Sequence, residues 1–219
     1  MIVKFSPPRG TLFGERWHSL LQLEHLANDV LRENGVAAAH TRIVQSPQRT
    51  YLQSERFDRV GTGGKRHVVA ASAVHEAFVT SPRLHWIDTC EAMVKHKWLS
   101  ASDAHTVALS YWFGKFIGNT DMHFGNLSFF VDDVVNPVST PTPVYDMLPM
   151  MWRPDIHQGH LDPSPLREPV IAPGYAAQAA LVRPWAVHYW QCACDTAGLS
   201  TELRQLCAEN ARRLEHGFG

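Results

Sequence analysis

The first third of the chain alternates apolar and polar positions in a pattern that predicts short strands around one helix. "MIVKF" alternates and is rich in β-branched residues, which predicts a strand from the first residue. Residues 15–34 carry apolar side chains at helical spacing and Gly35 follows them, so we expect a helix that ends there. "HTRIVQS" and "TYLQSERF" predict two strands with a turn at Pro47, and "RVGTGGKRHVVAAS" predicts a further pair with its glycines at the turn.

The middle of the chain changes to a helical pattern. "SASDAHTVALSYWFGKFIG" predicts a helix that is capped by Ser100 or Ser102 and ends at Gly118. After it, "LSFFV" predicts a strand, "DDVVN" a turn, and "PTPVYDMLPM" a further strand that leads into a loop. This order predicts a small mixed lobe followed by a larger, mainly helical lobe, with the crossover between residues 57 and 80.

The last third combines an irregular segment with two helices. Residues 152–174 are rich in Pro, Gly and His, which is typical of irregular chain. We expect helices at about 184–197, beginning at Pro184, and at 201–216, capped by Ser200.

Composition narrows the classes of function. With 219 residues, 45% hydrophobic and 19% charged, the chain can bury the core of one domain or of two closely packed lobes. A formal net charge of -1 gives no reason to expect direct binding to nucleic acid or to an anionic membrane. No apolar run approaches the roughly 18 residues that span a bilayer, and the N-terminus is too polar for a signal peptide. The four cysteines lack the spacing of a zinc site, so we expect free thiols and a cytoplasmic location.

Short polar side chains gather in "GNTDMHFGNLSFF", residues 118–130, between the predicted helix and the strand. Asp121 and Asn126 are five positions apart, and Asp146 ends the later apolar stretch "PVYDM". In phosphoryl transfer one aspartate orients or deprotonates the attacking hydroxyl, while an asparagine and a second aspartate hold Mg²⁺. On the loop alone, a cluster in which Asn119 and Asp121 satisfy free backbone groups at the helix end is an equal alternative.

Two further features favour phosphoryl transfer. Lys4 lies in a predicted strand that leads to a helix containing Glu24, and kinases need a strand lysine on the phosphates with a helix glutamate to hold it. "SERFDR" lies at the link between the two predicted lobes, where backbone groups could pair with an adenine edge and Phe57 could cover the base.

Five stretches in this order resemble the HipA family of bacterial serine/threonine kinases, the toxin partners of HipB-type antitoxins. They are "IVKF", "LEHLA", "ERFDR", "GNTDMHFGN" and "YDMLPM", and the resemblance extends from residue 2 to about residue 155. It implies an α+β, protein-kinase-like two-lobed fold, with residues 1–60 as a partial N-lobe with hinge and residues 61–219 as a mainly helical C-lobe. Known members of the family phosphorylate a serine of an aminoacyl-tRNA synthetase.

The resemblance also implies roles for eight residues, with ATP and Mg²⁺ as cofactors. Asp121 would be the catalytic aspartate, with His123 beside it and close to the nucleotide. Lys4 would contact the ATP phosphates, and Glu24 would position Lys4. Glu55 and Phe57 would form the adenine-binding hinge, and Asn126 and Asp146 would bind Mg²⁺. The implied partners are a protein substrate and a HipB-like antitoxin.

The sequence departs from this family at its front end. Only three residues precede Lys4, so neither a glycine-rich loop nor the family's usual N-terminal subdomain lies before it. "GTGGK" at 61–65 lacks Walker A spacing and predicts a β-turn. We therefore expect low activity from this chain alone, as one half of a split kinase completed by a second chain or as a truncated remnant.

Three other interpretations compete. A non-catalytic binding module would hold a partner without turnover, and the absent glycine-rich loop favours it. A metal-dependent hydrolase could use Asp121, His123 and Asp146, but it leaves Lys4 and Glu24 unexplained. The run Asp155, His157, His160 and Asp162 contains possible metal ligands, yet the flanking prolines predict an exposed loop.

Overall fold

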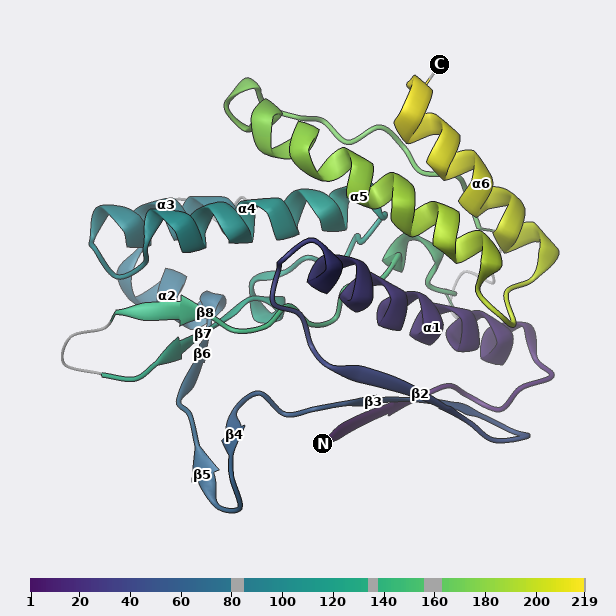
Figure 1. The fold of residues 1–219 in the computed structure, drawn as a ribbon, viewed down its shortest axis with the longest axis horizontal. Helices are drawn as coiled ribbons and strands as arrows, with labels where there is room; N and C mark the ends of the chain where they lie inside the picture. Colours follow the sequence, from purple (N-terminus) through teal and green to yellow (C-terminus); the bar gives the residue numbers. More distant parts are fainter. Residues whose placement is uncertain (80–84, 134–137, 156–162, 219) are drawn as a thin grey trace.

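A computed structural model describes residues 1–79, 85–133, 138–155 and 163–218. It is a mixed α+β structure (Figure 1), as the sequence predicts. The strands are β1 (Ile2–Phe5), β2 (Thr41–Gln45), β3 (Thr50–Ser54), β4 (Arg59–Val60), β5 (Gly64–Lys65), β6 (Val68–Ala70), β7 (Ser128–Val131) and β8 (Ser139–Pro141). The α-helices are α1 (Leu12–Glu33), α2 (Ala71–Phe78), α3 (Trp86–Lys95), α4 (Ala101–Phe116), α5 (Ala176–Asp195) and α6 (Thr201–His216).

The described strands form three small antiparallel sheets, ordered β1–β3–β2, β4–β5 and β6–β7–β8. Helix α1 lies between the first sheet and α5 and contacts both (Figure 1). It begins where the Thr11 hydroxyl accepts the Gly14 N–H at 2.9 Å, and it ends before Gly35, whose φ of 77° suits a residue without a side chain. The proposed division at residue 60 stays a prediction.

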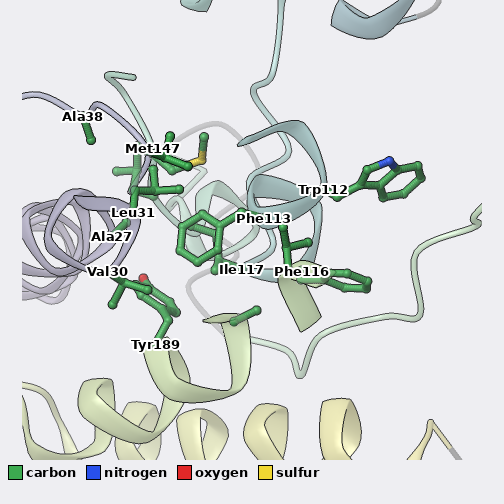
Figure 2. Close-up of a cluster of buried hydrophobic side chains, with 14 of the residues drawn as sticks. Ala27, Val30, Leu31, Ala38, Trp112, Phe113, Phe116, Ile117, Met147 and Tyr189 are labelled. Atoms are coloured by element: carbon green, nitrogen blue, oxygen red, sulfur yellow. The ribbon is translucent and has the colours of Figure 1, made fainter. Parts of the chain in front are cut away.

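One hydrophobic core joins α1 to the C-terminal helices. Figure 2 shows Val30 and Leu31 of α1, Phe113 of α4 and Tyr189 of α5 pointing toward one another. Each fully buried aliphatic or aromatic side chain of this kind contributes about 1.5–3 kcal/mol through the hydrophobic effect. Met147 belongs to the same core, so the chain next to Asp146 is anchored in it.

The predicted helices are present, with one boundary wrong and two helices missed. α4 and α6 are capped by Ser100 and Ser200 as predicted. α5 begins at Ala176, so Pro184 lies inside the helix and does not start it. The sequence analysis did not predict α2 and α3. α3 is capped by His85, a residue type that seldom signals a helix start.

Two strand predictions need correction. Gly61 and Gly63 of "GTGGK" do lie in the turn between β4 and β5, but Val68–Ala70 pairs with β7 and does not join that hairpin. "PTPVYDMLPM" forms a strand only up to Pro141, followed by an isolated bridge at Val144. The backbone of Asp146 has a φ of 54°, which a strand cannot accommodate.

Candidate active site

Lys4 forms the centre of the candidate site. The register of β1 on β3 places Lys4 opposite Leu52, a fully buried residue of the first sheet. The Lys4 ammonium group donates to Glu24 Oε1 of α1 at 2.6 Å and also forms an ion pair with Asp146. One cation therefore joins residues that are 20 and 142 positions away along the chain.

Glu24 is held in an unusual electrostatic environment. It is 3% exposed, and its second oxygen, Oε2, has no hydrogen-bond partner among the residues that the structure describes. Burial raises the pKa of Glu24 to about 6, although the pairing with Lys4 opposes that shift. Burial also disfavours the charged form of Lys4, but the neighbouring Glu24 and Asp146 outweigh it and raise the pKa of Lys4. At neutral pH both partners are therefore charged.

Asp146 lies in a strained loop that Asn119 fixes in place. The φ of 54° puts Asp146 in the left-handed region, which is uncommon for a residue other than glycine. Asn119, only 3% exposed, donates from Nδ2 to the Asp146 carbonyl at 3.2 Å. The same side chain accepts the Asp121 N–H at 3.0 Å through Oδ1. Asn119 thus joins the two segments that carry the candidate carboxylates.

The loop from residue 118 to residue 126 is organised through its backbone. Asn126 donates from Nδ2 to the Asp121 carbonyl at 2.8 Å, so the Oδ1 of Asn126 points away from that carbonyl. His123 accepts the Gly125 N–H at Nδ1, and its Nε2 lies 4.0 Å from Asp121 Oδ1. The Asp121 side chain is 48% exposed, so it is accessible from solvent.

The predicted hinge residues line the same cavity as Lys4. Glu55 donates its N–H to the His40 carbonyl at 2.9 Å, and the Phe57 ring packs against Tyr145 at 5.8 Å between centroids. The cavity has a volume of about 290 Å³, and its lining includes Lys4, Glu24, Glu55, Phe57, Tyr145 and Asp146.

Asp121, His123 and Asn126 do not line this cavity but belong to the neighbouring loop. Tyr145 connects the two parts, because its hydroxyl donates to the Gly125 carbonyl at 2.8 Å. The sequence analysis did not assign Tyr145 any role, and it gave Asn119 only the role of satisfying backbone groups. The sequence signal for both residues is their position: Tyr145 directly precedes Asp146, and Asn119 lies two positions before Asp121.

The oxygen donors of this site suit Mg²⁺ better than they suit a metal ion whose ligands all come from the protein. Within the described ranges, no three His, Cys, Asp or Glu residues are placed to hold a metal ion. Mg²⁺ needs few protein ligands because phosphate and water oxygens complete its shell. The carboxylate of Asp146 and the Oδ1 of Asn126, whose Nδ2 already donates to the Asp121 carbonyl, are oxygen donors of that kind. His157, His160 and Asp162 lie outside the described residues.

Comparison with solved structures defines the class. The HipA of Shewanella oneidensis MR-1, solved with HipB and its operator DNA, matches with a TM-score of 0.57 at 18% identity, covering 90% of this chain and 55% of that one. The proinflammatory kinase CtkA of Helicobacter pylori matches with a TM-score of 0.59 at 12% identity, covering 97% of this chain and 85% of that one. The chain has a protein-kinase-like fold, as predicted.

Sequence comparison defines the family. The model of the HipA-like C-terminal domain matches residues 1–217. Toxin YjjJ of Escherichia coli (strain K12) is 30% identical over 220 residues, which cover 98% of this chain and 47% of that protein. The chain belongs to the HipA-like C-terminal domain family, which confirms the resemblance, and it spans about half the length of this curated relative. Within the described residues, no helix combines the length and apolarity needed to cross a membrane.

Proposed function

We propose that this chain is the catalytic core of an ATP-dependent serine/threonine protein kinase, acting as the toxin component of a toxin–antitoxin system. The carrying observation is the arrangement of Lys4, Glu24 and Asp146 around one ammonium group at a cavity that also contains the hinge residues. A strand lysine held by a helix glutamate beside a metal-binding aspartate is the arrangement that kinases use.

Each side chain has a defined task in this proposal. The ammonium group of Lys4 has three N–H donors. Two of them bond to Glu24 and Asp146, which leaves one for a phosphate oxygen. Asp146 and Asn126 would hold Mg²⁺, which neutralises charge on the phosphates when bound. Asp121 would orient the acceptor hydroxyl or take its proton, with His123 beside it. Glu55 and Phe57 would border the adenine.

The proposed transfer also needs a loop that covers the ATP phosphates. Kinases place a glycine-rich loop over the phosphates, upstream of the strand lysine. In this sequence three residues precede Lys4, and the chain spans 47% of Toxin YjjJ. We propose that a preceding segment or a second chain supplies the loop. Loss of such backbone donors costs roughly 3–4 kcal/mol each in other enzymes, so weak transfer by this chain alone fits the proposal.

Calorimetric titration of ATP, with and without Mg²⁺, tests the proposed nucleotide site. The chain should bind ATP only when Mg²⁺ is present, and Asp146→Ala should lose the Mg²⁺-dependent part. Asp195→Ala is a matched control, since Asp195 is exposed and does not line the cavity. Folded wild-type chain that binds no ATP would contradict the proposal.

The competing function is a kinase-like binding module without turnover. The joint presence of Asp121, Asn126 and Asp146 favours catalysis over this function. By resemblance, we propose a HipB-like antitoxin as partner and an aminoacyl-tRNA synthetase as substrate. The relative of Shewanella oneidensis was solved with HipB, which supports an antitoxin partner.

A further inference from the structure

A second and larger cavity opens beside the loop that carries Asp121. It has a volume of about 800 Å³, within the range of binding sites. It is lined by residues of α4, by Asn119 and Thr120 after that helix, and by the extended chain of residues 164–170. We call it the α4 cavity. Because Asn119 also holds the Asp121 N–H, the cavity adjoins the place where an acceptor hydroxyl would be presented.

The extended chain that lines the α4 cavity is fixed by the helices behind it. The Leu166 N–H donates to Asn210 Oδ1 at 2.7 Å, and Arg213 donates to the Leu166 carbonyl at 3.2 Å. The Trp152 indole N–H donates to the Ser164 carbonyl at 2.8 Å. A segment held by three such hydrogen bonds needs less ordering when a ligand binds.

Most of the charged side chains that line the cavity form no ion pair with the described residues. Lys115 on α4 and Arg167 on the extended chain form no ion pair or side-chain hydrogen bond with any described residue. Glu168 is the one carboxylate among the described lining residues. His85 already faces Asp88 at 3.3 Å. Two free cations against one carboxylate make the cavity favourable to an anionic ligand.

The aromatic lining supports a chain-like ligand. Trp112 lines the cavity, and Figure 2 shows its indole directed away from α1, on the far side of the core. Its N–H is buried and has no acceptor among the described residues. Tyr175 lies 6.2 Å from Trp112 and 5.5 Å from His85 between ring centroids. Aromatic faces suit a peptide, because they pack against the aliphatic parts of its backbone and side chains.

We propose that the α4 cavity docks an acidic segment of the phosphoacceptor protein and so selects substrates that carry carboxylates close to the acceptor hydroxyl. The proposal rests on the kinase function proposed above. An extended peptide advances about 3.3 Å per residue, so carboxylates a few positions from the hydroxyl reach from Asp121 into the cavity. Lys115 and Arg167 would receive those carboxylates.

Fluorescence anisotropy with two labelled peptides tests the proposal on the full 219-residue chain without nucleotide. One peptide has glutamates and aspartates around a single serine, and the other has glutamines and asparagines in their place. We expect the acidic peptide to bind at least about tenfold more tightly than its amide counterpart. Arg167→Glu should weaken binding of the acidic peptide about tenfold, and Glu168→Lys should strengthen it several-fold. Both side chains are exposed, so the variants should fold.

Arg212→Glu is the matched control, because it makes the same charge change at an exposed position of α6 outside the cavity. It should leave the affinity within about twofold of wild type. The proposal is overturned if wild type does not bind the acidic peptide, if the amide peptide binds equally well, or if Arg212→Glu weakens binding as much as Arg167→Glu does. Peptide binding without ATP binding would refute the kinase function and not the acidic site, whereas ATP binding without peptide binding would refute the docking alone.

Discussion

The side chain of Asn119 bonds to both candidate catalytic segments, with its Nδ2 3.2 Å from the Asp146 carbonyl and its Oδ1 3.0 Å from the Asp121 nitrogen. The amide of Asn119 carries a donor and an acceptor on one planar group, so it can make both bonds at once. Because Asn119 is buried, either bond left unmade would strand a backbone group away from water. Asn119 therefore links the segments of Asp121 and Asp146 directly, beside the backbone bond from Met151 to the Gly118 carbonyl.

Asn119→Asp should keep one of these two hydrogen bonds and remove the other. A carboxylate still accepts the Asp121 N–H but cannot donate to the Asp146 carbonyl, so we expect a loss of about 1–3 kcal/mol in the free energy of unfolding, measured with urea. Mg²⁺-dependent ATP binding should weaken as Asp146 is released. Asn34→Asp is the control, since Asn34 donates to the Val30 carbonyl at the end of α1, away from the cavity. Equal ATP binding by both variants would contradict the assigned role of Asn119.

Lys4→Met should destabilise the chain for an electrostatic reason. It leaves the Glu24 carboxylate buried without its cation, which costs about 3–5 kcal/mol when a buried pair is broken. The double variant Lys4→Met, Glu24→Gln removes both charges and should recover most of that loss. The double variant should still fail to bind ATP. Thermal unfolding would measure the recovered stability, and calorimetry on the same samples would measure ATP binding. A double variant as unstable as Lys4→Met would show that the pair is not what stabilises this region.

The raised pKa of Glu24, about 6, predicts a pH dependence with a definite sign. The folded state binds this proton more tightly than the unfolded state, whose ordinary value is 4.5. The contribution of Glu24 to stability is therefore full below pH 4.5 and is lost as the pH rises through about 6. The difference in unfolding free energy between wild type and Glu24→Gln should fall by about 2 kcal/mol from pH 4.5 to pH 7. Urea titrations at several pH values would measure it, and a constant difference would contradict the burial of Glu24 as the cause.

The sequence predicted the parts of this fold that depend on local pattern. The cap residues Ser100 and Ser200 and the apolar period of α1 are local signals, and the corresponding helices form. Pro184 was misleading because a proline favours the first turn of a helix, yet here the preceding Ala-rich turns continue into it. The pairing of β6 with β7 joins segments about sixty positions apart, which no short pattern encodes.

The candidate site was predictable in its residue types and less so in its connections. Lys4, Glu24 and Asp146 were singled out by order and spacing, and the structure brings their side chains together. The Asn119 bridge was not predictable, because the left-handed backbone of Asp146 and the direction of its carbonyl arise only when the loop packs on Met147 and the core.

Asp121→Asn should separate catalysis from binding. Both backbone bonds of Asp121, its N–H to Asn119 and its carbonyl from Asn126, survive the substitution, so the loop should keep its shape. Removal of the carboxylate should lower γ-phosphate transfer to a serine peptide by about 10²–10⁴-fold, the usual effect of losing a general base. Affinity for ATP with Mg²⁺ should stay within about twofold of wild type, and Asp195→Asn should change neither quantity. Transfer that persists in Asp121→Asn would exclude Asp121 as the base. If wild type shows no transfer while a partner still binds, the binding-module function would be favoured instead.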